Sequence, residues 1–500
     1  MEKTLIFLLI IPGIFSSAEL TSGDALDTEI SRTTTVCTTC NTEIPSSGVA
    51  DSTSDSWSDI HPWVTTEYPT TATTTEETTT TEPSEHLENE PNKETSSEVD
   101  DQDDSKDHDD QCDENAQPEE VKKFAEAMMD FSIDLLKHAD PELKKPNVVI
   151  SPFSVALGLL QLSLGAGKDT EKKLLETLHV QSLKCLHNTL NNVREELKKT
   201  MKMASRIYLK KGFRIKKCFL KRSEEWYGSK TLNLARNKDD NLESINKWVR
   251  EVTEGMIPKF LSDMPSDVVL MLLNAMHFKG VWKNKFDPNM TVQDVFYVSD
   301  DLTVPVDMMT AQKYPLRWFL HENLDSQVAK LSFKGNMSFV VVMPLHYQWN
   351  LSKILDNFNR TELYSRFPKE KQTFLRMPKL QLDFKLELNN ALSTLGLGEL
   401  FHHPDLSGIS DESLFVSSVQ HQSSLEVNEE GAEAAAVTAV ITSRSLASYS
   451  INRPFLFFLF DDARGLPMFL GYVRNPSPGS YYKKKEFRFQ DKNGKGSIPK

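Results

Sequence analysis

Cysteine is scarce in this chain, with five in 500 residues: Cys37, Cys40, Cys112, Cys185 and Cys218. So few cysteines exclude a disulfide-dense scaffold but allow one or two bridges, and an odd number leaves one thiol outside any intramolecular pair. Cys37 and Cys40 form a C-x-x-C pair, but no strand or helix pattern surrounds them. We therefore expect a local disulfide there and not a redox or zinc site.

Catalytic signatures are also missing. The chain has no G-x-S-x-G, no G-x-x-x-x-G-K, no H-E-x-x-H and no dinucleotide-binding glycine pattern. The nearest approach to a metal site is "FHHPD", but adjacent histidines in a polar turn, here His402 and His403, are more often solvated than bound to metal. We expect no enzyme active site, no metal and no cofactor.

Positive charge is in deficit, and the chain has a net charge of −15. This acidic balance argues against a nucleic-acid partner. Long apolar runs are rare as well. Only the opening "MEKTLIFLLIIPGIFSSAEL" joins a lysine, an apolar stretch and small residues near Ala18, which predicts a cleavable secretory signal over residues 1–18. No later run is long enough to cross a bilayer, so we expect no membrane contact. Four Asn-x-Ser/Thr sequons agree with an extracellular, secreted protein: Asn289, Asn336, Asn350 and Asn359.

Residues 19–116 are rich in threonine, proline and acidic residues and almost devoid of core-forming side chains. Such a segment cannot offset its ordering entropy by burial, so we predict a disordered extension. Its threonine run is typical of an O-glycosylated stalk, and a plain acidic linker explains the composition equally well.

The character of the chain changes near residue 117. Apolar residues three and four apart predict a helix over residues 119–139 with one buried face: Val121, Phe124, Met128, Phe131 and Leu135. Strict alternation in "KLQLDFKLEL" (379–388) predicts a half-buried strand, and the continuous run "NMSFVVVMPL" (336–345) predicts a strand covered on both faces. Helical patterns dominate the first half and strands the second, with no linker between. We predict one α+β domain over residues 117–476.

The stretch "EEGAEAAAVTAVITSRSLASYSINRPFLFFLF" (429–460) combines an alanine run with β-branched residues. The alanines favour a short helix, whereas the valines, threonines and isoleucine that follow favour extended backbone. With a period of two, small residues share one face and Glu433 falls on the other, where its charge can stay in water. Such a strip could enter a sheet without burying a charge.

Four segments resemble the landmarks of the serpin family, in the family's order: "NVVISPFSVALGLLQLSLGAGKDT" (147–170), "INKWVREVTEGMI" (245–257), "LNAMHFKGVWKNKFDP" (273–288) and "YSINRPFLFFLFDDARGLPMFLGYVRNP" (449–476). The resemblance implies a serpin fold, with a large central β-sheet, surrounding helices and an exposed reactive-centre loop. It also implies that "EEGAEAAAVTAV" holds the proximal hinge, formed by Gly431, Ala432, Glu433, Ala434, Ala435, Ala436, Val437 and Thr438.

In inhibitory serpins a serine protease attacks the loop and forms an acyl-enzyme, after which the cleaved loop inserts into the central sheet and traps the protease. The small hinge residues imply an inhibitory member rather than a non-inhibitory binding scaffold. We expect the inhibitor to act as a monomer. Arg444 is the only basic residue between Glu433 and Arg453, which implies a trypsin-like target and attack at Arg444–Ser445. The usual hinge-to-bond count would select Ser445. We prefer Arg444 because two serpins with the shorter spacing also expose arginine.

Within the family, strings such as "RIYLKKGFRIKKCFL" and "GISDESLFVSSVQHQSSLEV" resemble the plasmin-inhibiting members. That resemblance implies a disulfide between Cys112 and Cys185, plasmin as the target in plasma and plasminogen as a candidate partner. Residues 477–500 would form a tail whose lysines bind kringles: Lys483, Lys484, Lys485, Lys492, Lys495 and Lys500.

Alternatives to these assignments stay open. The alternative to kringle binding is a solvated basic tail, which could also bind heparin. The threonine-rich extension resembles instead the serpins that inhibit complement and contact-system proteases. The first glutamine after the signal is Gln102, so cross-linking to fibrin is not predicted.

Overall fold

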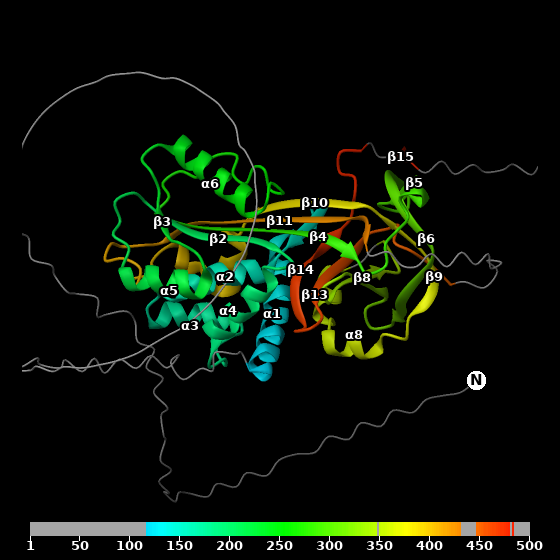
Figure 1. Ribbon diagram of the computed structural model, residues 1–500, viewed down its shortest axis with the longest axis horizontal. Helices are drawn as coiled ribbons and strands as arrows, with labels where there is room; N and C mark the ends of the chain where they lie inside the picture. Colours follow the sequence, from blue (N-terminus) through cyan, green and yellow to red (C-terminus); the bar gives the residue numbers. More distant parts are fainter. Residues whose placement is uncertain (1–116, 348–349, 432–446, 481–482, 485–500) are drawn as a thin grey trace, which may run out of the picture.

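The computed structural model describes residues 117–347, 350–431, 447–480 and 483–484 (Figure 1). They form two β-sheets flanked by helices, so the predicted α+β class is confirmed. Most helices precede residue 253 and most strands follow it. The longer helices are α1 (Pro118–Ala139), α2 (Pro152–Ser163), α3 (Lys168–Thr177), α4 (Leu186–Leu197), α5 (Lys217–Tyr227) and α6 (Lys238–Val252). Short ones follow: α7 (Leu351–Asp356), α8 (Arg360–Arg366), α9 (Asn389–Leu392), and the turns η2 (Pro288–Met290), η3 (Ser393–Leu397) and η4 (Gly398–Phe401).

Helix α1 confirms the helix predicted from the apolar spacing. Phe124, Met128, Phe131 and Leu135 are fully buried, while Val121 packs at the edge of the core. A proline in the first turn, acidic residues beside it and basic residues in the last turn all suit a helix of this direction. Helix α2 is buried along its whole length, and Ser151 caps it by accepting a hydrogen bond from the Ser154 amide.

The smaller sheet has five strands in the order β10 (Leu380–Glu387), β11 (Val416–Gly431), β4 (Leu270–Trp282), β2 (Lys202–Leu209) and β3 (Leu232–Asn233). Its central pair, β4 and β11, is parallel, whereas β10 pairs with β11 and β2 pairs with β4 in antiparallel fashion. The alternation predicted for residues 379–388 is confirmed, because Leu380, Leu382 and Phe384 are buried and the residues between them are exposed.

The larger sheet runs β1 (Asn147–Ile150), β14 (Leu466–Val473), β13 (Phe455–Asp461), β8 (Met337–Pro344), β7 (Ser326–Ser332), β6 (Leu302–His321), β9 (Lys371–Pro378) and β12 (Ala447–Ser450). Two further strands, β5 (Val292–Tyr297) and β15 (Lys483–Lys484), also pair with β6. Every residue of β8 is buried, which confirms the strand predicted from the continuous apolar run.

Helix α6 covers one face of the five-stranded sheet, and α1, α2, α4 and α5 lie on the other side (Figure 1). The alternation of β4 divides its side chains between two hydrophobic clusters. Met276 and Phe278 belong to the large core beneath the sheet, while Leu273 and Ala275 pack with α6. Both faces of this sheet are therefore covered along β4.

Candidate functional site

The predicted hinge begins where the central parallel pair of the five-stranded sheet ends. Residues 418–427 of β11 pair in continuous register with residues 271–280 of β4, and after a bulge Gly431 lies opposite Trp282. We call this contact between β4 and β11 the seam. The hinge residues after Gly431 and the bond Arg444–Ser445 lie outside the described residues.

The described strands after residue 446 belong to the ten-stranded sheet. Strand β12 (Ala447–Ser450) pairs in parallel with β9, and the register begins at Ala447 opposite Thr373. The segment between Gly431 and Ala447 thus connects the seam to the edge of the ten-stranded sheet.

Aromatic residues close the hinge end of the seam. Trp282 is completely buried, and its indole Nε1 donates a 2.7 Å hydrogen bond to the carbonyl oxygen of Asn428. The ring of Trp282 stacks on Phe333 with centroids 4.1 Å apart and meets Phe286 edge-on. The Phe286 amide in turn donates to the Glu429 carbonyl, at 3.2 Å. The last residues of β11 are therefore held to the end of β4 and to the segment that follows it.

Gly431 is required here because of space. A Cβ atom at this position would lie 2.6 Å from the Cα and 2.8 Å from the amide nitrogen of Lys285. These are backbone atoms, which cannot rotate away as a flexible side chain could. Gly431 thus permits a close approach between the end of β11 and the chain after β4.

Ion pairs flank the hinge glycine. Glu429 is 11% exposed and accepts hydrogen bonds from Lys379 Nζ at 2.7 Å and from Thr291 Oγ1 at 2.6 Å. Burial acts to raise the pKa of Glu429, but these two hydrogen bonds, a backbone hydrogen bond and the charge of Lys379 together hold the pKa below its usual range. Across the seam, Lys279 Nζ lies 2.9 Å from Glu430 and 3.8 Å from Glu426.

A buried histidine lies at the middle of the seam. His421 on β11 is fully buried; its Nε2 accepts a hydrogen bond from the Ser151 amide at 3.1 Å and lies 2.7 Å from the Ser423 hydroxyl oxygen. Its Nδ1 has no partner among the described residues. Burial lowers the pKa of His421 to about 3, so the imidazole is neutral in the folded protein near neutral pH.

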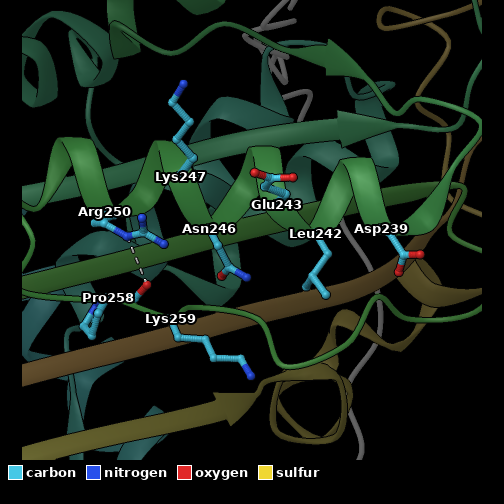
Figure 2. A pocket seen from close by; sticks show the side chains of 8 residues that line it. All are labelled: Asp239, Leu242, Glu243, Asn246, Lys247, Arg250, Pro258 and Lys259. Carbon is cyan, nitrogen blue, oxygen red and sulfur yellow. Dashed lines mark hydrogen bonds between the residues drawn. The ribbon is translucent and has the colours of Figure 1, made fainter.

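The opposite face of the sheet carries a strap, which we define as residues 253–268 after α6. The Asn246 side chain fixes the strap, because its Oδ1 accepts from the amides of Phe260 and Leu261 at 2.8 and 2.7 Å and its Nδ2 donates to the Leu261 carbonyl at 2.9 Å. Figure 2 shows Asn246 directed toward this segment and Arg250 donating to the Pro258 carbonyl at 3.3 Å.

A cavity of about 410 Å³ lies between α6 and the strap. In Figure 2 the side chains of Lys247 and Lys259, which line it, point in opposite directions and do not converge on one point. These two lysines therefore do not form a common binding site, and we take the seam as the candidate site.

The predicted glycosylation sites and the histidine pair lie at exposed positions of the described chain. All four sequon asparagines are exposed, as a glycan requires; the Oδ1 atoms of Asn350 and Asn359 cap α7 and α8. Glycosylation stays a prediction.

His402 and His403 are exposed, and no group of three or more potential metal ligands occurs in the described ranges. Within those ranges, too, no helix has the length and apolar character to cross a bilayer.

Two further predictions concern the ends of the domain. Cys185 is disulfide-bonded, while Cys112 lies outside the described residues, so their pairing stays a prediction. Cys218 is half-buried and forms no disulfide with any described residue. Of the tail lysines, Lys483 and Lys484 form β15 through their backbone, opposite Thr303 and Leu302 of β6. Lys485, Lys492, Lys495 and Lys500 are not among the described residues.

Comparison with known proteins decides the family. The family model described as serpin (serine protease inhibitor) matches residues 126–476. The chain belongs to the serpin family. The alpha-2-antiplasmin of Bos taurus is 48% identical to this serpin over 377 residues, which are 75% of this chain and 77% of the relative. The plasma protease C1 inhibitor of Mus musculus is 33% identical over 375 residues, or 73% of each chain.

The fold of this serpin matches solved structures as well. The crystal structure of mouse protein-Z dependent protease inhibitor aligns with a TM-score of 0.65 at 24% identity, covering 72% of this chain and 100% of that one. The expectation of a serpin fold is thereby confirmed, and the assignment of the four sequence landmarks to the family was correct.

Sequence reasoning missed several residues that shape this site. Trp282 and Lys279 come from β4, His421 comes from β11, and Lys379 lies between β9 and β10. These segments are distant in the chain, and only strand pairing brings them together. A signal was present for one of them, because an indole within the apolar run of β4 must bury its N–H and therefore needs an acceptor. Nothing in the sequence indicated that this acceptor is the Asn428 carbonyl.

Proposed function

We propose that this serpin is a secreted inhibitor that traps plasmin as a covalent acyl-enzyme by inserting its cleaved loop at the seam, and so restrains fibrinolysis. The observation that carries the proposal is the parallel pairing of β4 with β11, the strand that ends at the hinge glycine. A segment that turns back after Gly431 would run antiparallel to β11 and, for the same reason, antiparallel to β4. Insertion would replace one parallel ladder by two antiparallel ones, which are slightly more stable per residue.

The length of the loop supports this reading. Residues 432–444, which cleavage after Arg444 would release from β12, number thirteen, and β4 also has thirteen residues. A strand rises about 3.3 Å per residue, so the released segment matches the full length of its neighbour. The part after the cleaved bond would stay with the other sheet, because β12 is paired to β9.

The choice of plasmin rests on the similarity to alpha-2-antiplasmin and on two features of this chain. Arg444 offers a cation to a trypsin-like specificity pocket. The lysine tail leaves the body at β15, on the same sheet that receives the loop through β12. Kringles held by the tail would raise the local concentration of the protease at the loop. The lysine side chains of the tail would present ammonium groups to lysine-binding clefts.

The remaining parts of the proposal follow from the same activity. The chain is not an enzyme, since it would take part in the reaction once, as a substrate that is not released, and it would need no cofactor. Residues 1–18 would be removed on secretion into plasma, residues 19–116 would extend from the serpin domain, and the inhibitor would act as a monomer.

The test is a time course of the purified protein with plasmin, analysed on denaturing gels with and without the lysine analogue 6-aminohexanoate, with mass determination of the released peptide. We expect an SDS-stable complex, a peptide that begins at Ser445, and slower formation with the analogue. The Arg444→Ala variant should form no complex, and a chain ending at Ser480 should react at the rate seen with the analogue. Cleavage without a complex would show that the protein is a substrate and not an inhibitor.

A second candidate is an inhibitor of complement or contact-system proteases. The threonine-rich extension and the similarity to the plasma protease C1 inhibitor favour it. This candidate predicts that loss of the tail leaves the rate on the best target unchanged. A plasmin reaction that is indifferent to the analogue, together with fast trapping of a complement protease, would select it.

A further inference from the structure

The α6 face of the five-stranded sheet consists of two parts that meet at the seam. The hydrophobic cluster under α6 contains side chains of β2, β4, α6 and the strap, among them Ala204, Leu273, Val249 and Phe260. It contains no residue of β10 or β11. On this face the apolar side chains of the strap therefore pack on the β2–β4 side of the seam.

One side chain of β10 bridges this division. Leu382, Phe384 and Leu386 pack into the core beneath the sheet, so Lys385, which lies between them in the alternation, projects from the α6 face. Lys385 Nζ donates a 2.7 Å hydrogen bond to the Phe260 carbonyl of the strap, and the ammonium lies 5.7 Å from the centre of the Phe260 ring.

This hydrogen bond crosses the seam near its middle. In the strand registers Lys385 lies opposite Gln422 of β11, and Gln422 lies opposite Ala275 of β4. Ala275 and Phe260 belong to the same cluster. The bond therefore connects a strand on one side of the seam to a segment packed on the other side, across the intervening strand.

Insertion of a strand at the seam would move β10 and β11 away from β4 by one strand spacing, about 4.8 Å. A hydrogen bond of 2.7 Å does not survive such a displacement unless the strap follows β10. The strap cannot follow without withdrawing Phe260 and its neighbours from the cluster on β4. Opening the seam thus requires loss of either the bond or that packing.

We propose that Lys385 is a latch that slows opening of the seam, so that the sheet stays closed until a loop is ready to enter. The inference rests on the insertion step of the proposed function and does not depend on which protease is the target. Lys385 is a positioning residue: it touches neither the loop nor a protease, and it acts through the strap.

The chain offers a matched control for this latch. Lys202 Nζ on β2 forms an ion pair of 2.6 Å with Glu254, which also belongs to the strap. Because β2 and β4 lie on the same side of the seam, this tie would stay intact during insertion. Lys385→Met and Lys202→Met each remove one lysine contact to the strap, but only the first removes a contact across the seam.

The test uses the intact, full-length protein and a synthetic peptide with the sequence of residues 431–444, added in trans without protease. Uptake is followed by the gain in resistance to thermal unfolding. We expect Lys385→Met to take up the peptide about five-fold faster than wild type, which corresponds to one hydrogen bond of ordinary strength. Lys385→Arg, which can donate to the same carbonyl, should stay near the wild-type rate, and Lys202→Met should match wild type.

Equal rates for Lys385→Met and wild type would overturn the latch, as would equal acceleration by Lys202→Met, which would indicate general loosening of the strap. A wild-type protein that takes up no peptide would overturn the insertion step and the latch with it. A protein that takes up peptide but does not trap plasmin would refute only the proposed target, so the two failures are distinguishable.

Discussion

Trp282 Nε1 and the carbonyl oxygen of Asn428 are 2.7 Å apart, and this hydrogen bond joins β4 to β11 just before the hinge glycine. The indole is completely buried, so the bond is sheltered from competing water. It lies at the end of the seam where an inserting loop would enter first. Its strength should therefore influence both the stability of the closed sheet and the ease of opening.

Replacing Trp282 by phenylalanine tests this relationship. The Asn428 carbonyl would lose its donor in a buried setting, which costs about 1–3 kcal/mol, and the stacking on Phe333 would be weakened. We expect the free energy of unfolding of the intact protein, measured in urea, to fall by that amount. The control is Trp318→Phe. Trp318 is half-buried on β6, outside the seam, so this variant should change the free energy of unfolding by less. A loss of stability equal in the two variants would contradict the role of the indole donor.

Gly431→Ala should destabilise the intact protein because the new Cβ would overlap the backbone of Lys285. Relieving such an overlap requires a backbone shift at the end of β11, for which we expect about 1–3 kcal/mol. Thermal unfolding measures the change. Gly479→Ala serves as the control, since a Cβ there meets no atom within 4 Å. Equal unfolding temperatures for the two variants would show that the hinge has room for a side chain.

Acidification should weaken the fold through His421. Its pKa is about 3 in the folded protein, against about 6.5 for an unfolded histidine, so the unfolded state binds the proton more tightly. The contribution of neutral His421 is complete above pH 6.5 and is lost as the pH falls toward 3, at about 1.4 kcal/mol per pH unit. Between pH 7 and pH 5 this amounts to about 2 kcal/mol.

The measurement is the free energy of unfolding at both pH values for wild type and for His421→Gln. When the pH is lowered from 7 to 5, the variant should lose about 2 kcal/mol less stability than wild type. A second buried histidine, His187, has a pKa lowered to about 4 by burial and by the nearby charge of Arg222, and its contribution is common to both proteins. If wild type and His421→Gln show the same pH dependence, the folded and unfolded states bind a proton at His421 equally well, and the prediction is wrong.

Ala436→Glu should convert the inhibitor into a substrate of its protease. With a period of two, Ala436 shares the small-residue face with Ala432 and Ala434, and an unpaired carboxylate on that face would have to be buried during insertion. We expect at least about ten times more inhibitor to be consumed per protease trapped, because a penalty above 1.4 kcal/mol favours release. Titration of plasmin activity measures the ratio. Glu433→Gln alters the other face and should leave it unchanged; equal ratios for both variants would contradict insertion in this register.

The order of the four family landmarks, the α1 face and the strands at 337–344 and 380–387 could all be predicted from the sequence. Local periodicity is enough for such elements, because each must place its apolar side chains on a covered face wherever it packs. The small-residue strip after Gly431 and the single Arg444 are likewise visible in one dimension, because composition and position alone identify them.

The seam could not be predicted in this way. Which strand lies beside β11, and in which direction, depends on long-range pairing between residues about 150 positions apart in the chain, which no local pattern encodes. The same holds for Trp282 with Asn428, Lys379 with Glu429, and Lys385 with Phe260. Sequence alone determined the family, helix α1, strands β8 and β10, and the composition of the segment after Gly431. Only the tertiary structure decided which strands lie beside the end of β11 and which contacts cross the seam, because these depend on pairing between strands that are remote in sequence.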